Sequence, residues 1–253
     1  MRTKKPATHY LATDADGIIP ASLAAGTPVN LADAVGTTID HPNPCQNLWY
    51  DETAFSYFRT VTAPGEVLAD VPGWPRRLWI IEPLGTTGTW GGRDSAHRLF
   101  AHRIRVVQET ESWQALGSRG RQVLDLIDHQ LPDLARTWAA THTADPDRVH
   151  QAYEDWRLCN SREPEAASGM NAKQMALSVA GSSRCSAALW TVSRLAIDAA
   201  HTAADEFGRS AAHYAAMRAE ALAFAVLLEN RLRDYTLTAL RGAALDQALT
   251  AAA

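Results

Sequence analysis

Hydrophobic residues change their spacing near Ser112, and this change divides the chain into two differently patterned halves. Before this point the apolar runs are short, and proline or glycine interrupts them every few residues. The segment RRLWIIEPLG (76–85) is a compact β-rich run that ends at Pro83 and Gly85, and HRIRVVQE (102–109) alternates charged with apolar side chains. Such alternation is typical of a half-buried strand, so both segments are predicted to be strands.

The first half contains three further strand candidates, around Leu11, at 29–31 and at 48–50. The segment TAFSYF (53–58) is predicted to be a short helix, because Ala54, Tyr57 and Phe58 fall on one helical face.

After Ser112 the apolar residues recur at steps of three and four, which is the spacing of an amphipathic helix. In RGRQVLDLIDHQLPDLARTWAATH these positions are Val123, Leu124, Ile127, Leu131, Leu134 and Trp138. Pro132 begins a new helix or kinks the existing one. Asp145 and Pro146 suit the N-cap and the first residue of the next helix. Two longer helices are predicted at about 183–206 and 210–240, and the short connection around Gly208 favours antiparallel packing.

These patterns predict a mixed α+β domain at residues 1–111, followed by an α-helical domain at residues 112–253. The alternative is that the helices pack directly on the sheet, so that the chain forms one unit.

Composition limits the classes of function. The 253 residues are 46% hydrophobic and 21% charged, as in an ordinary soluble globular protein. The formal net charge is −4, so no surplus of basic residues favours a nucleic-acid partner. The basic run from Arg2 to Lys5 is short and is interpreted as a frayed terminus. The sequence predicts no oligomeric state.

The sequence also favours the cytoplasm over a membrane or the cell exterior. No apolar run of about 18 residues is present, and no secretory signal follows the basic start. Cys45, Cys159 and Cys185 are far apart and lack CxxC spacing, which disfavours both a zinc site and a disulfide framework.

Three stretches of the first half carry a resemblance to a known family. They are HYLATDADGIIPASLAAG (9–26), NLWYDETAFSYFRTVTAPGE (47–66), and the pair RRLWIIEPLG and HRIRVVQE. In this order they resemble the opening strand, the aromatic strand with its short helix, and the last strands of the small ADP-ribosyltransferase fold, especially the rifampin ADP-ribosyltransferases. The resemblance implies a small split β-sheet whose gap holds a dinucleotide. Alternatively, the chain resembles uncharacterised phage and actinobacterial proteins that pair a similar module with an alanine-rich helical tail.

The resemblance further implies that NAD is a substrate and that ADP-ribose passes to a small molecule or a protein. The family's histidine falls on Leu11, whose side chain cannot bond a ribose hydroxyl. His9 lies two residues earlier, on the same strand face, and is the candidate catalytic replacement. Asp94 is the only carboxylate of the loop TTGTWGGRDSAHRLFAHR and matches the family's acidic residue.

Four residues complete the candidate NAD site by the same resemblance, namely Tyr10, Thr13, Trp49 and Tyr50. Thr13 matches the threonine of the opening motif, and Trp49 or Tyr50 matches the tyrosine that stacks on nicotinamide. Each assignment has a structural alternative: His9 as an exposed strand-start residue, Trp49 as a core aromatic and Asp94 as a solvated loop residue.

Other motifs are interpreted structurally. Glu109 and Glu111 match the Glu-x-Glu motif of another subclass of the same transferase fold. The first-strand Arg and the Ser-Thr-Ser stretch of that subclass are missing here, so the two glutamates are interpreted as a charge pair at the end of a strand. His201 and Asp205 are four residues apart, yet no third metal ligand is visible, and no metal site is predicted. The sequence contains no GxGxxG, Walker-type or HExxH motif.

The loss of histidine at position 11 leaves two hypotheses open. The first is an active ADP-ribosyltransferase-like enzyme with NAD as its substrate. The second is a catalytically inactive scaffold that acts as a nucleotide- or protein-binding module. The first hypothesis requires His9, Trp49 or Tyr50, and Asp94 to face one cleft, and the second does not.

Overall fold

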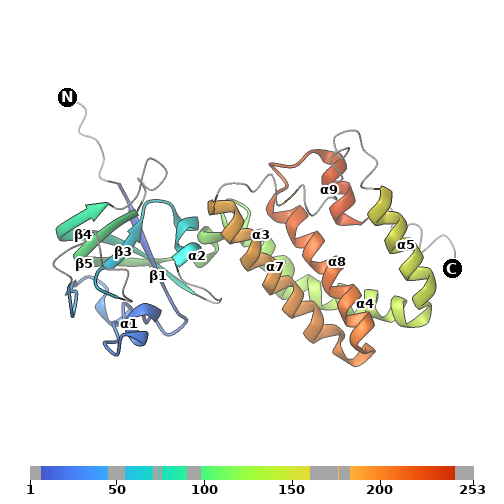
Figure 1. Ribbon diagram of the computed structural model, residues 1–253, viewed down its shortest axis with the longest axis horizontal. Helices are drawn as coiled ribbons and strands as arrows, with labels where there is room; N and C mark the ends of the chain where they lie inside the picture. The colour runs from blue at the N-terminus through green and yellow to red at the C-terminus, as the bar shows by residue number, and fades with distance from the viewer. Residues whose placement is uncertain are drawn as a thin grey trace. The chain divides into compact units, whose positions relative to one another are not determined.

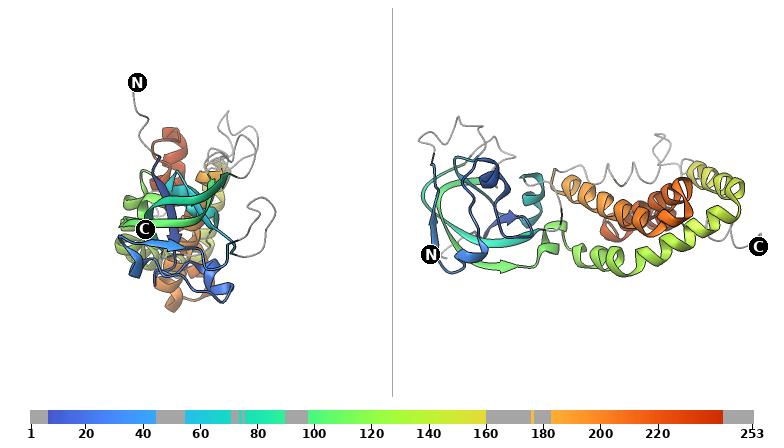
Figure 2. Two further views of the ribbon diagram at one scale, coloured as in Figure 1. Left: turned by 90° about the vertical axis from the view of Figure 1, so that its left-hand side faces the viewer. Right: turned by 90° about the horizontal axis from the view of Figure 1, so that it is seen from below.

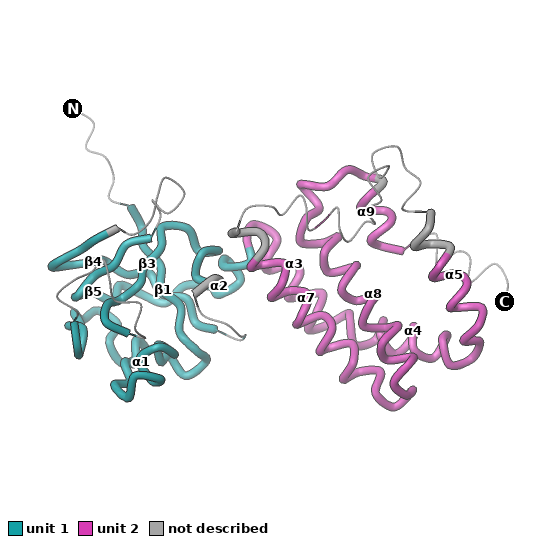
Figure 3. Tube along the Cα trace, in the orientation of Figure 1, with its two compact units in different colours: residues 1–116 teal, residues 117–253 magenta. Residues whose placement is uncertain are grey.

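The computed structural model divides the chain into two compact units, Met1–Leu116 and Gly117–Ala253 (Figure 3). The structure describes residues 7–44, 55–70, 74, 76–89, 98–159, 176 and 183–242. The sequence placed the corresponding boundary after Glu111, five residues before the end of unit 1. Each unit has its own core and is described separately.

Unit 1 is built on five antiparallel strands, β1 (His9–Thr13), β2 (Thr38–Asp40), β3 (Phe58–Val61), β4 (Arg77–Thr89) and β5 (Arg98–Thr110) (Figure 1). Their order is β2-β5-β3-β1-β4, and β4 also pairs with β5. Strands β1, β3, β5 and β4 therefore form a closed ring of pairings, to which β2 adds along β5. The α+β class predicted from the sequence is confirmed. Within the described residues the strands form one closed sheet rather than two separated halves.

Two local predictions in this unit are wrong. Strand β4 does not stop at Pro83 and Gly85, because Gly85 takes a positive φ of 70° and the register with β5 shifts between Leu84 and Thr87. Such a bulge bends a strand without ending it, and it is why β4 continues to Thr89. Phe58 does not belong to a helix but begins β3, where its side chain is fully buried.

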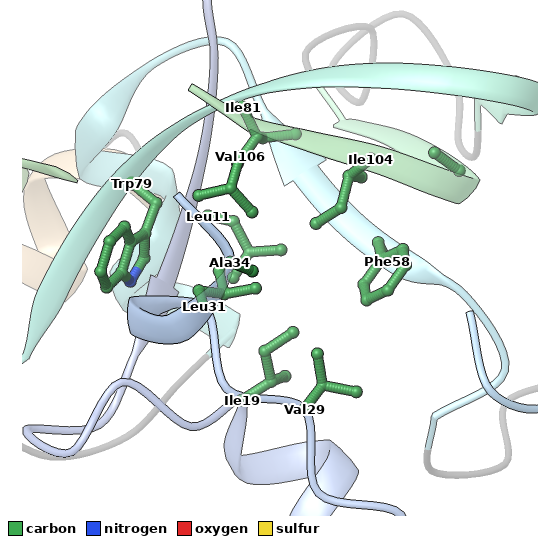
Figure 4. Packing of buried hydrophobic residues seen from close by; sticks show 11 residues of the cluster. Leu11, Ile19, Val29, Leu31, Ala34, Phe58, Trp79, Ile81, Ile104 and Val106 are labelled. Atoms are coloured by element: carbon green, nitrogen blue, oxygen red, sulfur yellow. The ribbon is translucent and has the colours of Figure 1, made fainter. Parts of the chain in front are cut away.

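The inner face of the ring is filled by apolar side chains. Residues 19–34 contribute to this core and include α1 (Pro20–Ala24) and η1 (Ala32–Ala34). Figure 4 shows the side chains of these segments and of the strands directed toward one another. The cluster contains Leu11, Ile19, Val29, Leu31, Ala34, Phe58, Trp79, Ile81, Ala101, Ile104 and Val106. A small ring of strands has an interior of this kind, just wide enough for its own side chains.

Three short elements complete unit 1. They are η2 (Pro64–Glu66), α2 (Val67–Asp70) and η4 (Ser112–Leu116), and η2 packs against η4.

Unit 2 is helical, as its three- and four-residue periodicity predicts. Its elements are α3 (Gly120–Asp125), η5 (Leu126–Gln130), α4 (Leu131–Ala144), α5 (Pro146–Cys159), α7 (Ser183–Ala204), η6 (Asp205–Phe207), α8 (Arg209–Leu227) and α9 (Asp234–Arg241). Pro132 lies in the first turn of α4, directly after the single π-helical turn η5. The helix predicted over 210–240 is two helices, because α8 ends at Leu227 and a turn precedes α9.

Helices α7 and α8 pack side by side and antiparallel, with α4 against both (Figures 1 and 2). Alanines line the contact and leave almost no accessible surface there, for example Ala196 and Ala200 on α7 and Ala215 and Ala219 on α8. Small side chains allow the two helix backbones to approach closely. None of the described helices combines the length and the apolar character that crossing a membrane requires.

Candidate functional site

Leu11, at the position of the family's histidine, belongs to the core of unit 1. Its side chain is 5% exposed and lies in the apolar cluster with Trp79 and Ile81 of β4 (Figure 4). Leu11 pairs directly with Trp79 across the two strands, so both side chains project from the same face of the sheet. The interior face of β1 at this position is therefore packed against hydrocarbon.

Thr13 faces the same interior, and its hydroxyl is used within the fold. It accepts a 2.9 Å hydrogen bond from the indole Nε1 of Trp79 and donates one of 3.1 Å to the carbonyl oxygen of Asp14. Both Thr13 and Trp79 are fully buried. The hydroxyl satisfies the only polar atom of the buried indole, which is a structural role within the core.

His9 is half-buried on the same face of β1, and its Nδ1 lies 3.2 Å from the hydroxyl oxygen of Thr60 on β3. Thr60 donates its single hydroxyl proton to the carbonyl oxygen of Leu99 at 3.0 Å. We therefore assign the imidazole proton to Nδ1, which leaves Nε2 as an acceptor. Burial lowers the pKa of His9, so the ring is neutral near pH 7.

Among the remaining candidates, Tyr10 lies within the described residues. Tyr10 alternates with His9 along β1 and projects from the opposite face of the strand. Trp49, Tyr50 and Asp94 lie outside the described residues. Within the described residues, His9 and Thr13 share one face of β1, one on each side of the buried Leu11.

A cavity of about 450 Å³ lies at the far end of β1, lined by Arg76, Glu109, Thr110, Glu111 and Ser112. Thr13 pairs with Arg77 near this cavity, whereas His9 pairs with Ile81, about 13 Å away along the strand.

Glu109 is held in the fold by a two-pronged ion pair. The guanidinium of Arg77 donates from Nε at 2.8 Å and from Nη2 at 2.7 Å to the two carboxylate oxygens, and these bonds lower the pKa of Glu109. The same guanidinium lies 4.7 Å above the ring of Trp79.

His41 is a second buried imidazole of unit 1. It is 4% exposed and packs against the rings of Phe55 and Phe58, at centroid distances of 4.3 and 5.0 Å. Its Nδ1 accepts a 3.1 Å bond from the backbone N–H of Asn43. Burial, together with the neighbouring His102, lowers the pKa of His41 to about 4.

Unit 2 contains a cavity that the sequence did not predict. It has a volume of about 210 Å³ and is lined by His142 of α4, by Val149, His150, Tyr153 and Glu154 of α5, and by Ser210, His213, Tyr214 and Met217 of α8. Residues 150, 153 and 154, and residues 210, 213, 214 and 217, each follow the spacing of one helical face. That spacing is visible in the sequence, but the pairing of these faces depends on how three helices pack.

Aromatic rings meet at Tyr214 in this cavity. Its ring centroid lies 5.5 Å from that of His142 and 6.1 Å from that of Tyr153, the latter in an edge-to-face arrangement at 79°. Ser210 Oγ lies 3.4 Å from His142 Nε2. Burial, and secondly the nearby His150, lower the pKa of His142, so this imidazole is neutral near pH 7.

The other sequence motifs occupy ordinary positions. His201 lies on α7 and its ring is 6.4 Å from that of His213, while Asp205 begins η6. Within the described residues, no three His, Cys, Asp or Glu side chains are arranged to hold a metal ion. Comparisons with protein families, with curated proteins and with solved structures found no match for this chain.

Proposed function

We propose that this chain is a binding protein and that unit 1 serves it as a folded scaffold rather than as a transferase centre. The observation that carries the proposal is the burial of Leu11 at the position where the resembling family has its histidine. A ribose-binding side chain at this position has to face a cleft, whereas Leu11 faces Trp79, Ile81 and Val106.

The neighbours of Leu11 support the same conclusion. A dinucleotide that reached this face of β1 would have to displace the layer that includes Ile19, Val29 and Leu31. Uncovering one such side chain costs about 1.5–3 kcal/mol, and several would be uncovered together. It would also separate the buried hydroxyl of Thr13 from the indole of Trp79. The interior of unit 1 is therefore better suited to stability than to ligand entry.

The cavity of unit 2 supports the binding half of the proposal. It combines aromatic surface with a few polar groups, which is typical of small-molecule sites.

The active transferase is the second candidate, and one observation favours it. His9 is half-exposed and neutral, and its Nε2 can accept a proton or a hydrogen bond. In this alternative His9 acts with Asp94, while Tyr10, Thr13 and Trp49 or Tyr50 contact NAD, and ADP-ribose passes to a small molecule or a protein.

Incubation of the full chain with NAD labelled in its adenylate part, with and without cell extract, separates the two candidates. A second readout is release of nicotinamide, which detects transfer to water. The scaffold predicts neither labelled product nor nicotinamide above the level of a heat-denatured control. Transfer by the wild type that falls at least tenfold in His9→Ala, but not in the exposed control His129→Ala, would overturn the proposal.

Thermal unfolding with NAD gives an independent measurement. If the Kd for NAD is one hundredth of the added NAD concentration, binding stabilises the folded chain by about 2.7 kcal/mol. This raises the melting temperature by several degrees. The scaffold proposal for unit 1 predicts no such rise at 1 mM NAD.

A further inference from the structure

We propose that the cavity between α4, α5 and α8 binds a small organic cation, an amine whose ammonium group contacts Glu154 and whose carbon body lies against Tyr153 and Tyr214. This inference rests on the proposed binding function and gives it a location and a ligand class. It does not depend on any residue of unit 1.

The charge of the lining is the first argument. Among the nine residues that line the cavity, Glu154 carries the only carboxylate, and no lysine or arginine is present. Burial lowers the pKa of His142, which favours the neutral form of this lining imidazole. A carboxylate in a lining without lysine or arginine favours a cation over an anion.

The guanidinium of Arg218 contacts one lining residue, Tyr214, without itself being part of the lining. Arg218 is 2% exposed, and its Nη1 donates to the hydroxyl of Tyr214 at 3.2 Å. Its guanidinium lies 4.7 Å above the ring of Trp138 and does not line the cavity.

The hydrogen-bonding groups supply the second argument. A primary ammonium group donates three hydrogen bonds and accepts none. Around the cavity, the carboxylate of Glu154 and the hydroxyl oxygen of Ser210 offer acceptors, while Nε2 of His142 already lies 3.4 Å from Ser210 Oγ. Glu154 also interacts within the chain, so an ammonium group would share its two carboxylate oxygens with those contacts.

The aromatic surface supplies the third argument. The rings of Tyr153 and Tyr214 stand nearly perpendicular, so together they form two sides of a corner. A cation over the face of such a ring gains about 0.5–2 kcal/mol, and the methylene groups of an amine gain from burial against the same rings and Met217. The volume of about 210 Å³ is smaller than a drug-sized site and suits one ring or a short chain.

An anion is the competing occupant, because protonated imidazoles and the hydroxyl of Ser210 are donors. Glu154 opposes it, and the lowered pKa of His142 keeps one of the three imidazoles neutral. The three probes of the test therefore share one skeleton and differ in charge.

The test is calorimetric titration of the full chain at pH 8 with 2-phenylethylamine, with neutral 2-phenylethanol and with anionic 3-phenylpropanoate. The amine is expected to bind saturably in the millimolar range or tighter, and at least tenfold more tightly than the alcohol or the acid. Glu154→Gln is expected to weaken the amine at least tenfold. The matched control Glu206→Gln, at an exposed acid of η6 outside the cavity, is expected to leave binding unchanged. Circular dichroism and melting temperature verify that each variant is folded.

Several results would overturn the assignment. They are no saturable binding of the amine, equal affinity for the amine and the alcohol, an unchanged affinity in folded Glu154→Gln, or tighter binding of the acid at pH 8 or pH 5.5. Tyr153→Leu gives a second measurement, with an expected loss of at least threefold for the amine. Transfer of ADP-ribose is assayed separately, so failure of this site and failure of the scaffold proposal give different results.

Discussion

Replacing Leu11 with histidine places the resembling family's residue back at its own position. If the face of β1 is core, the variant is destabilised and gains no activity. Burial of a leucine side chain contributes about 1.5–3 kcal/mol to stability, and Leu11 is only 5% exposed. An imidazole buried without a hydrogen-bond partner costs about a further 1–3 kcal/mol. We therefore expect Leu11→His to lower the free energy of unfolding of unit 1 by about 2.5–6 kcal/mol.

Native-state hydrogen exchange measures this change within unit 1. The backbone N–H of Val106 donates to the carbonyl of Thr37 at 3.0 Å and reports on the strands around the core. Its protection is expected to fall by the amount above. The control Leu11→Met keeps the volume and the apolar character, so it is expected to cost less than about 1.5 kcal/mol.

One combination of results would refute the reasoning. If Leu11→His is within 1 kcal/mol of the wild type and also releases nicotinamide from NAD, position 11 faces a cleft and not a core. A folded, stable variant without activity would still contradict the burial argument.

Three further predictions test other parts of the fold. Trp79→Phe removes the indole N–H that donates to the buried hydroxyl of Thr13 and leaves a void. It is expected to lower the free energy of unfolding by about 2–3 kcal/mol, measured by hydrogen exchange during urea unfolding. The pKa of His41 falls from 6.5 to about 4 on folding, so the unfolded chain takes up this proton first as the pH drops. Stability is therefore expected to decline from pH 6.5 to pH 4 by about 3 kcal/mol from this group, and His41→Gln, titrated in parallel, should lack that part of the decline. Gly242→Ala is expected to lower the free energy of unfolding by about 1–2 kcal/mol in urea unfolding, because Gly242 has a φ of 69° and an added Cβ would lie 2.9 Å from the guanidinium of Arg218.

Local patterns in the sequence were sufficient for most of the secondary structure. The alternation in HRIRVVQE predicted β5, because successive side chains of a strand point to opposite faces. The three- and four-residue steps after Ser112 predicted the helices of unit 2 for the corresponding reason. Predictions failed where a long-range contact overrides the local signal. Pairing with β5 carries β4 past Pro83 and Gly85, and burial between strands makes Phe58 part of β3.

The candidate sites depend on contacts between residues that are distant in sequence, which periodicity does not encode. The resemblance aligned Leu11 with a histidine, whereas the burial of Leu11 depends on β4 and on the segment around Leu31. Thr13 matched a family motif, and only the fold paired its hydroxyl with an indole 66 residues away. Nothing in the sequence distinguished His142, Glu154 and Tyr214 from other residues of their helices. Packing of α4, α5 and α8 places them around one cavity, because the position of a helix face is set by its neighbours and not by the helix itself.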